Sequence, residues 1–374
     1  MKIIQLVPEL NSGGVERGTL EIARALVAAG HESVVISNGG RMVAQLEAEG
    51  TRHIQLPIHR KSLSSLWQIR PLRKLIQQER ADILHVRSRI PAWLTHLALR
   101  KIAVKDRPIL ISTVHGFYSV SRYSEIMTRA DRVIAVSDSV VEYIHKNYPA
   151  CPADKITRIY RGIDPKEFPH DYQPSQLWWQ HTLQEFPQLE NKIWLTLPGR
   201  ITRLKGHESL LKLVTTLKDQ FAVHGVIVGG AHEKKQAYLE ELQTRVEALG
   251  LSDHVTFVGH RSDMREWLAA SDLVFSLSEK AETFGRTTLE ALSVGTATVG
   301  WDRGGVAEIL NRCYPQGLVE AENDDALIKA VENLLSNPTP PAPVHDFQLS
   351  QMTDQTLALY AEMVQTRKNQ TRLN

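Results

Sequence analysis

The chain has 374 residues, which is long for one compact core and suits two α/β domains. Its formal net charge is +2, so no overall charge favours nucleic acid as a partner. The two cysteines, Cys151 and Cys313, fit neither a disulfide framework nor a zinc-ligand pattern, and this suits a reducing compartment. The sequence contains no signal-peptide core and no run of about 18 apolar residues, so we expect a cytoplasmic protein.

Short β-branched runs alternate with amphipathic patterns in the first part of the chain. The segment Glu16–Ala29 has apolar residues at helical spacing and lies between two such runs. This alternation predicts a parallel sheet whose strands are joined by right-handed crossovers. The predicted strands are Lys2–Val7, Glu32–Ser37, Ile54–Pro57, Ile83–Val86, Ile109–Val114 and Arg132–Val136.

The pattern breaks between residues 150 and 191 and then restarts. We therefore expect an α/β fold with Rossmann-like domains at residues 1–169 and 170–345, and a last helix within residues 346–374. Ligands of such sheets bind at the carboxyl ends of the strands, so we expect a cleft between two facing domains. The later strands are predicted at Ile193–Leu197, Ala222–Val228, Val255–Val258, Leu273–Phe275 and Thr298–Gly300.

The most informative motif follows the predicted strand Leu273–Phe275. A loop leads to an amphipathic helix that begins near Gly285, and the exposed N–H groups of a helix start favour an anion such as a diphosphate. Glu282 precedes this helix and Glu290 lies within it. A carboxylate can accept hydrogen bonds from two neighbouring hydroxyls, as on a sugar. Two glutamates at this spacing also fit a solvated helix face.

A second motif, Gly199–Gly206, follows the first strand of the second domain. Arg200 and Lys205 lie on this loop, where cations would neutralise a departing diphosphate. A loop that is simply solvated remains the alternative.

Two features of the first domain lie at predicted strand ends. Gly14 is in a glycine turn that lets the backbone approach a ligand closely, although the turn lacks the G-x-G-x-x-G fingerprint of dinucleotide binding. His115 directly follows the strand Ile109–Val114. A plain tight turn and a structural histidine remain open for these positions.

No acidic or histidine cluster in the sequence has metal-ligand spacing, and there is no Asp-x-Asp. We therefore expect no metal site and no metal requirement.

Together these stretches resemble the retaining glycosyltransferases of family four, which have the two-domain GT-B fold. The resemblance covers nearly the whole chain and is most specific in the Glu-x7-Glu stretch and in Gly-Arg-x4-Lys-Gly. It implies transfer of a hexose from a UDP- or GDP-sugar, without a cofactor. It also implies that the last helix crosses back to the first domain. The overall sequence is similar to enzymes of lipopolysaccharide core assembly, which implies a glycolipid or saccharide acceptor.

The resemblance assigns a role to each candidate position. It implies that Arg200 and Lys205 bind the diphosphate in place of a metal, that Glu290 holds the ribose, and that Glu282 contacts the transferred sugar. The remaining implied positions are Gly14 and Gly285 at the phosphates, Phe284 beside the sugar, Val258, Gly259 and Arg261 at the base, and His115 beside the reacting sugar.

Two stretches depart from the family pattern. Arg161 begins Arg-Gly-Ile-Asp where members commonly have Asn-Gly-Val-Asp, and Arg87-Ser-Arg89 is more charged than usual. Both departures add cations on the side where the acceptor is expected.

Three other functions are alternatives. A nucleotide-sugar epimerase shares the fold and needs no second substrate. A non-catalytic sugar-nucleotide sensor could keep Arg200, Lys205 and Glu290 without needing His115 or Glu282. An NAD-dependent oxidoreductase is disfavoured because the glycine fingerprint is absent.

The segment at residues 59–76 is basic and amphipathic, although Pro71 must interrupt or restart a helix there. An anionic membrane surface is therefore a candidate partner, on the cytoplasmic face of the inner membrane. The alternative is an ordinary domain helix with its apolar side in the core. The residues concerned are Arg60, Lys61, Leu63, Leu66, Trp67, Arg70, Arg73, Lys74 and Leu75.

Overall fold

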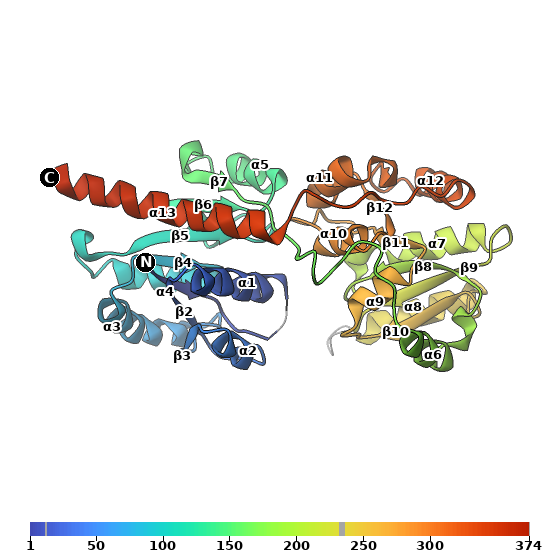
Figure 1. The fold of residues 1–374 in the computed structure, drawn as a ribbon, viewed down its shortest axis with the longest axis horizontal. Coiled ribbons are helices and arrows are strands. Elements are labelled where there is room, and N and C mark those ends of the chain that lie inside the picture. Colours follow the sequence, from blue (N-terminus) through green and yellow to red (C-terminus); the bar gives the residue numbers. More distant parts are fainter. Residues whose placement is uncertain (12, 232–235, 374) are drawn as a thin grey trace. The chain divides into compact units, whose positions relative to one another are not determined.

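The computed structural model describes residues 1–11, 13–231 and 236–373. The chain forms two compact units (Figure 1): unit 1 is Met1–Gly162 with Leu349–Asn374, and unit 2 is Ile163–Gln348. The sequence predicted divisions at 169/170 and 345/346, whereas the units divide at 162/163 and 348/349. Each unit has its own parallel sheet with helices packed on it.

Unit 1 contains a seven-stranded sheet in the order β3-β2-β1-β4-β5-β6-β7. Every neighbouring pair is parallel, and Ile4 of β1 lies opposite Val34 on one side and Leu84 on the other. The strands are β1 (Lys2–Leu6), β2 (Glu32–Ser37), β3 (Arg52–Gln55), β4 (Ile83–Val86), β5 (Ile109–Val114), β6 (Arg132–Ala135) and β7 (Ile156–Arg158). The helices are α1 (Gly14–Ala28), α2 (Val43–Ala48), α3 (Ile69–Glu79), α4 (Arg89–Leu99), α5 (Asp138–Asn147) and α13 (Leu349–Leu373).

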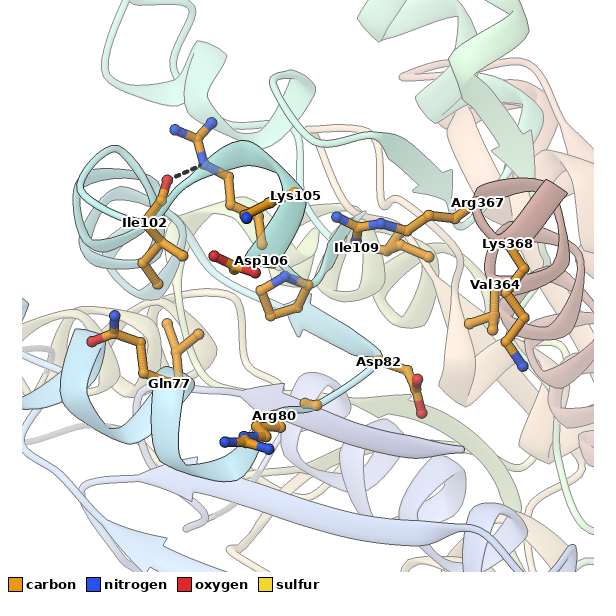
Figure 2. A pocket seen from close by; sticks show the side chains of 14 residues that line it. Gln77, Arg80, Asp82, Ile102, Lys105, Asp106, Ile109, Val364, Arg367 and Lys368 are labelled. Carbon is orange, nitrogen blue, oxygen red and sulfur yellow. Dashed lines mark hydrogen bonds between the residues drawn. The ribbon is translucent and has the colours of Figure 1, made fainter. Parts of the chain in front are cut away.

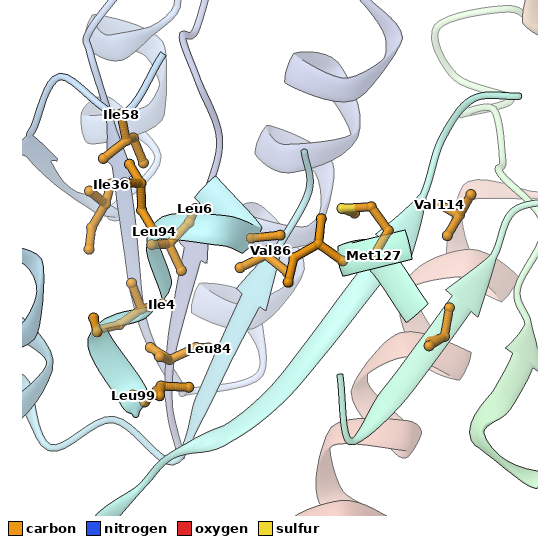
Figure 3. Close-up of a cluster of buried hydrophobic side chains, with 14 of the residues drawn as sticks. Ile4, Leu6, Ile36, Ile58, Leu84, Val86, Leu94, Leu99, Val114 and Met127 are labelled. Atoms are coloured by element: carbon orange, nitrogen blue, oxygen red, sulfur yellow. The ribbon is translucent and has the colours of Figure 1, made fainter. Parts of the chain in front are cut away.

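Successive residues of a strand point to opposite faces, so each face of the unit 1 sheet has its own core. Ile4 belongs to the cluster on one face, which is packed against α3 and α4 (Figure 3). Its neighbour Ile3 belongs to the cluster on the other face, which includes Met352, Leu359 and Tyr360 of α13. The last helix therefore packs on the first domain, as the resemblance implied.

Unit 2 contains a six-stranded parallel sheet in the order β10-β9-β8-β11-β12-β13. The central neighbours β8 and β11 bring their carboxyl ends to the same edge of the sheet. The strands are β8 (Ile193–Pro198), β9 (Val223–Val228), β10 (Val255–Gly259), β11 (Leu273–Ser276), β12 (Ala297–Trp301) and β13 (Leu318–Val319). The helices are α6 (Gln176–Glu185), α7 (His207–Leu217), α8 (Gln236–Ala248), α9 (Met264–Ala269), α10 (Arg286–Ser293), α11 (Gly304–Cys313) and α12 (Asp324–Ser336).

The aromatic stretch before β8, which shows no clean period in the sequence, contains the helix α6. Trp178 and Trp179 of this helix pack edge-on against Trp267 and Trp194, respectively. The Trp178 indole N–H donates to the Asp263 carboxylate at 2.7 Å. This aromatic cluster covers one face of the second sheet and joins α6 to the segment around α9.

Candidate functional site

Two of the sequence motifs meet in unit 2, because they follow the neighbouring strands β8 and β11. The Lys205 ammonium lies 2.5 Å from Oε1 of Glu282. The Ser278 hydroxyl donates to the same carboxylate oxygen at 2.7 Å, and the Glu279 amide donates to the Leu204 carbonyl at 3.0 Å. The cationic loop and the glutamate loop thus form one hydrogen-bonded unit.

Glycine makes this close approach possible. Gly206 has φ of +77°, and a Cβ atom there would lie 2.1 Å from the carbonyl oxygen of Leu277. A larger residue would therefore push the two loops apart. Gly229 allows a second close approach to the cationic loop. A Cβ atom at Gly229 would lie 1.9 Å from the carbonyl oxygen of Gly199.

The electrostatics of Glu282 follow from its surroundings. Burial raises the pKa of this carboxyl, but the Lys205 charge and the hydrogen bonds from Lys205 and Ser278 outweigh it and leave the pKa below its usual value. Glu282 is therefore an ionised hydrogen-bond acceptor at neutral pH, which suits contacts to hydroxyl groups rather than a role as a general acid.

The helix α10 begins directly after this loop. Gly285 is its N-cap residue, with φ of +90°, and a Cβ atom there would lie 2.7 Å from Cγ2 of Val306. A glycine cap supplies no side-chain acceptor for the first N–H groups of the helix, so they can serve an external anion. Within α10, the buried Glu290 accepts from Nε of Arg286 at 2.9 Å, which fixes its carboxylate one turn into the helix.

The start of α11 also lies at this loop, although no sequence motif predicted it. The Gly305 amide donates to the Glu282 carbonyl at 2.8 Å. A Cβ atom at Gly305 would lie 2.3 Å from Cα of Phe284, and one at Gly304 would lie 2.6 Å from the Glu282 carbonyl oxygen. Two helix N-termini, those of α10 and α11, therefore flank the loop of Glu282 and Phe284. Two adjacent glycines between a strand and a helix were the available sequence signal.

The remaining candidate residues of unit 2 differ in whether their side chains have hydrogen-bond partners. Arg200 is exposed, and within the ranges that the structure describes its side chain has no hydrogen-bond or ion-pair partner. Arg261 is held: Nε donates to the Val258 carbonyl at 2.9 Å and Nη1 to Glu185 at 3.1 Å. Gly259, with φ of +74°, ends β10, which is separated from β8 by β9.

Unit 1 holds the other two candidates at the carboxyl edge of its own sheet. Gly14 is the first residue of α1, and His115 follows β5. Burial, followed by the nearby charges of Arg87 and Arg161 and by His85, holds the pKa of His115 well below its usual value. The imidazole is therefore neutral at neutral pH. Arg87 and Arg161, noted in the sequence only as departures, line the same small cavity as His115.

A larger groove of about 760 Å³ lies elsewhere in unit 1 (Figure 2). Its lining includes Arg80, Asp82 and Pro108, which precede β4 and β5, so it lies at the amino edge of the sheet, opposite the motif-bearing ends. Size alone does not make it the reaction site, because none of the candidate residues lines it.

Among residues 1–11, 13–231 and 236–373, no three His, Cys, Asp or Glu side chains are placed to hold a metal ion together. In the same residues no helix is both long and apolar enough to cross a membrane.

Comparison with known proteins agrees with the architecture. Residues 12–167 match the profile "Glycosyltransferase Family 4", and residues 182–348 match "Glycosyl transferases group 1". A lipopolysaccharide core biosynthesis mannosyltransferase of Rhizobium meliloti is 30% identical over 201 residues, 53% of each chain. A solved glycosyltransferase from Rickettsia africae is 27% identical with a TM-score of 0.84, covering 97% of this chain and 98% of that one.

A second solved structure, the Anabaena protein HepE in complex with UDP and glucose, has a TM-score of 0.75 at 22% identity, covering 100% of this chain and 98% of its own. At this identity the likeness shows the fold. With two matched profiles over the two units, parallel α/β sheets in both and the Glu-x7-Glu stretch at the start of α10, the chain belongs to the family-four glycosyltransferases and has the GT-B fold.

Proposed function

We propose that this glycosyltransferase moves a hexose, with retention of configuration, from a UDP- or GDP-sugar to an acceptor hydroxyl. The observation that carries the proposal is the Lys205–Glu282 pair, at 2.5 Å, set between the starts of α10 and α11. A cation and two helix N-termini are complementary to a diphosphate, and an ionised carboxylate is complementary to sugar hydroxyls.

In this proposal the unit 2 residues act on the leaving group. As the bond between the sugar and the diphosphate breaks, negative charge grows on the diphosphate oxygens. Lys205, Arg200 and the N–H groups at Gly285 stabilise that charge without reorganisation, which lowers the barrier. Glu290 holds the ribose, and Glu282 orients the transferred sugar. In unit 1, neutral His115 is suited to donate a hydrogen bond to a sugar hydroxyl.

The acceptor side of the proposal rests on the relatives. The Rhizobium meliloti protein is named as a mannosyltransferase of lipopolysaccharide core biosynthesis. We therefore propose a glycolipid or saccharide acceptor in lipopolysaccharide core or a related cell-surface glycan. The candidates of an epimerase and a non-catalytic sensor are outcomes of the test below.

The proposal is tested by incubating purified protein with UDP- and GDP-hexoses and a saccharide acceptor. Transfer releases free nucleoside diphosphate and yields a new glycosidic bond of the donor's anomeric configuration. An epimerase would leave the sugar attached to the nucleotide in altered configuration. A sensor would bind the nucleotide and release nothing.

Turnover is expected to be unchanged in excess EDTA. The charges at the diphosphate are supplied by Lys205, Arg200 and helix N-termini, so no divalent cation is needed to neutralise the leaving group. Initial rates with EDTA, and with Mg²⁺ or Mn²⁺ added back, provide the measurement. A rate that collapses with EDTA and returns with either metal would contradict metal-independent transfer.

We also propose that the protein attaches to anionic membrane on the cytoplasmic face of the inner membrane. The structure divides the segment at residues 59–76 into η1 (Leu63–Gln68) and α3, with Pro71 in the first turn of the helix. Leu72 and Ile76 of α3 face the core, whereas Leu63 and Trp67 are 84% and 80% exposed. Large apolar side chains beside several cations are typical of an interfacial anchor.

Sedimentation with liposomes is expected to show binding that needs anionic lipid and fades at high salt. Each cation near an anionic surface is worth about 1 kcal/mol, so changing Arg70, Arg73 and Lys74 to Gln should weaken binding by about tenfold or more. A charge-matched triple change of Lys212, Lys218 and Arg245 in unit 2 is the control. Equal binding by both triple variants would disprove this segment as the anchor.

A further inference from the structure

A small cavity at the carboxyl edge of the unit 1 sheet is lined by two arginines that the proposed chemistry on the donor does not use. Arg87 follows β4, and Arg161 lies a few residues after β7. Both line the cavity together with His115. They belong to the two stretches, Arg87-Ser-Arg89 and Arg161-Gly-Ile-Asp, at which the sequence departs from the family pattern by gaining cations.

Both guanidinium groups are buried. Arg87 is 4% exposed and Arg161 is 8% exposed. Arg87 donates from Nη1 to the Gln5 side chain at 2.8 Å, but its buried Nε has no hydrogen-bond partner within the described part of the chain. Burying a guanidinium is costly unless its donors are satisfied, so this arrangement has a donor to spare for a ligand.

The two guanidinium groups converge on the first turns of α1. A Cβ atom at Gly18 would lie 2.5 Å from Nη2 of Arg161 and 3.2 Å from Nη2 of Arg87. A glycine at this position is therefore what allows both arginines to reach the same place. The positive end of the α1 dipole adds to their charge, and three positive features together favour an anion.

Two carboxyl groups, those of Glu21 and Glu16, lie near this charge. Oε2 of Glu21 lies 3.8 Å from Nη2 of Arg161. Burial raises the pKa of Glu16, the other carboxyl in this region, although a hydrogen bond from its own backbone amide and then the charges of Arg161 and Arg87 oppose that shift. The remaining polar wall is neutral: His85 is hydrogen-bonded to Tyr360 and Thr113, each at 2.6 Å, and its pKa is held low by burial and by Arg87.

We propose that Arg87 and Arg161 bind an oxyanion, either a phosphoryl or a carboxylate group, carried by the acceptor. Calling the ligand an acceptor depends on the proposed glycosyl transfer. The observations that support the anion site come from unit 1 alone. Two forked guanidinium groups beside a helix N-terminus match such a group in shape and charge. The cavity is small, so it takes the anionic group and leaves the rest of the acceptor outside it.

The binding test uses inorganic phosphate and acetate as separate probes, with the protein saturated by UDP so that the diphosphate-binding loops of unit 2 are occupied. One probe should raise the melting temperature of the wild-type protein. That shift should disappear in Arg87→Gln and in Arg161→Gln and persist in Arg100→Gln, an exposed control. The probe that acts identifies a phosphoryl or a carboxylate group.

A measurement on the wild-type protein covers the case in which a variant fails to fold. The Nε–H resonance of Arg87 should shift on titration with the active probe and stay in place with sodium chloride. Unchanged resonances with both probes, or an equal melting shift in all variants, would overturn the anion site.

The kinetic test uses matched acceptors such as glucose, glucose 6-phosphate and glucuronate. One anionic member should be preferred over glucose by about ten- to hundredfold in kcat/KM, as a charge-assisted contact provides. Arg87→Lys keeps the positive charge but lacks the planar guanidinium group with its several N–H donors. This variant should show a smaller preference for the anionic acceptor while its affinity for UDP stays the same. Equal use of all three acceptors would refute the acceptor assignment, whereas no transfer to any acceptor, with the melting shift intact, would refute only the proposed transfer.

Discussion

Replacing Lys205 with alanine is expected to lower kcat by about 10²–10³, the usual effect of losing one preorganised charge contact in a transition state. In the structure the Lys205 ammonium is fixed by Glu282 at 2.5 Å, so it is positioned before any substrate binds. Arg200→Ala should also cripple turnover, since this exposed cation begins the same loop. Steady-state kinetics with a UDP- or GDP-sugar provide the measurement.

A matched control lies on the same loop. Arg203 is exposed and pairs with Glu241 at the surface, and such surface ion pairs contribute little to the stability of a protein. Arg203→Ala should therefore keep its rate within about twofold of the wild-type rate. Near-normal turnover in both Lys205→Ala and Arg200→Ala would remove these residues from the site.

The same variant has an expected pH signature. Lys205 lowers the pKa of Glu282, and burial acts in the opposite direction. Removing the ammonium therefore raises the pKa, so Glu282 loses its charge at a higher pH than in the wild-type protein. Because the ionised form is the one that accepts hydrogen bonds from the sugar, the acidic limb of the pH–rate profile should move to higher pH.

Alanine substitutions of the two glutamates in the Glu-x7-Glu stretch are expected to have different effects. Glu290→Ala is expected to weaken binding of free nucleoside diphosphate by about ten- to hundredfold, because it removes a ribose contact present in substrate and product alike. Glu282→Ala should leave that affinity nearly unchanged and lower turnover by about 10²–10³, because it removes a contact to the transferred sugar.

Calorimetry with UDP and GDP separates these outcomes. Glu290 is paired with Arg286 inside α10, so Glu290→Gln, which fits the same space, distinguishes the lost contact from local damage to the helix. Equal losses of nucleotide affinity in the two alanine variants would contradict the division of labour.

Periodicity in the sequence located the buried strands well. Ile83–Val86 and Ile109–Val114 were predicted with the bounds that the structure shows, because short apolar, β-branched runs between helical patterns are typical of buried parallel strands. The edge strand β3 is Arg52–Gln55 rather than Ile54–Pro57, since its pairing with β2 is set by backbone register and three of its four residues are polar. The short strands β7 and β13 carry too few residues to show a period.

At the candidate site, the sequence predicted which loops carry the functional residues, but the contacts between those loops are visible only in the structure. Lys205 and Glu282 lie far apart in the chain, and only the pairing of β8 with β11 brings their loops together. Arg261 stays a predicted contact of the base, and its guanidinium also donates to Glu185 of α6, a helix whose sequence shows no clean period. Gly304 and Gly305 were missed because their role is a close approach to Glu282 and Phe284, which spacing along the chain does not encode.

Transfer itself is tested most directly by following the anomeric proton of a UDP- or GDP-hexose by NMR, with purified protein, saccharide acceptors and EDTA present. The account predicts that the donor signal falls, that free nucleoside diphosphate rises at the same rate, and that a new anomeric signal of the same configuration appears on the acceptor. A donor that is bound but stays intact, or one converted into an isomer still attached to its nucleotide, would contradict it.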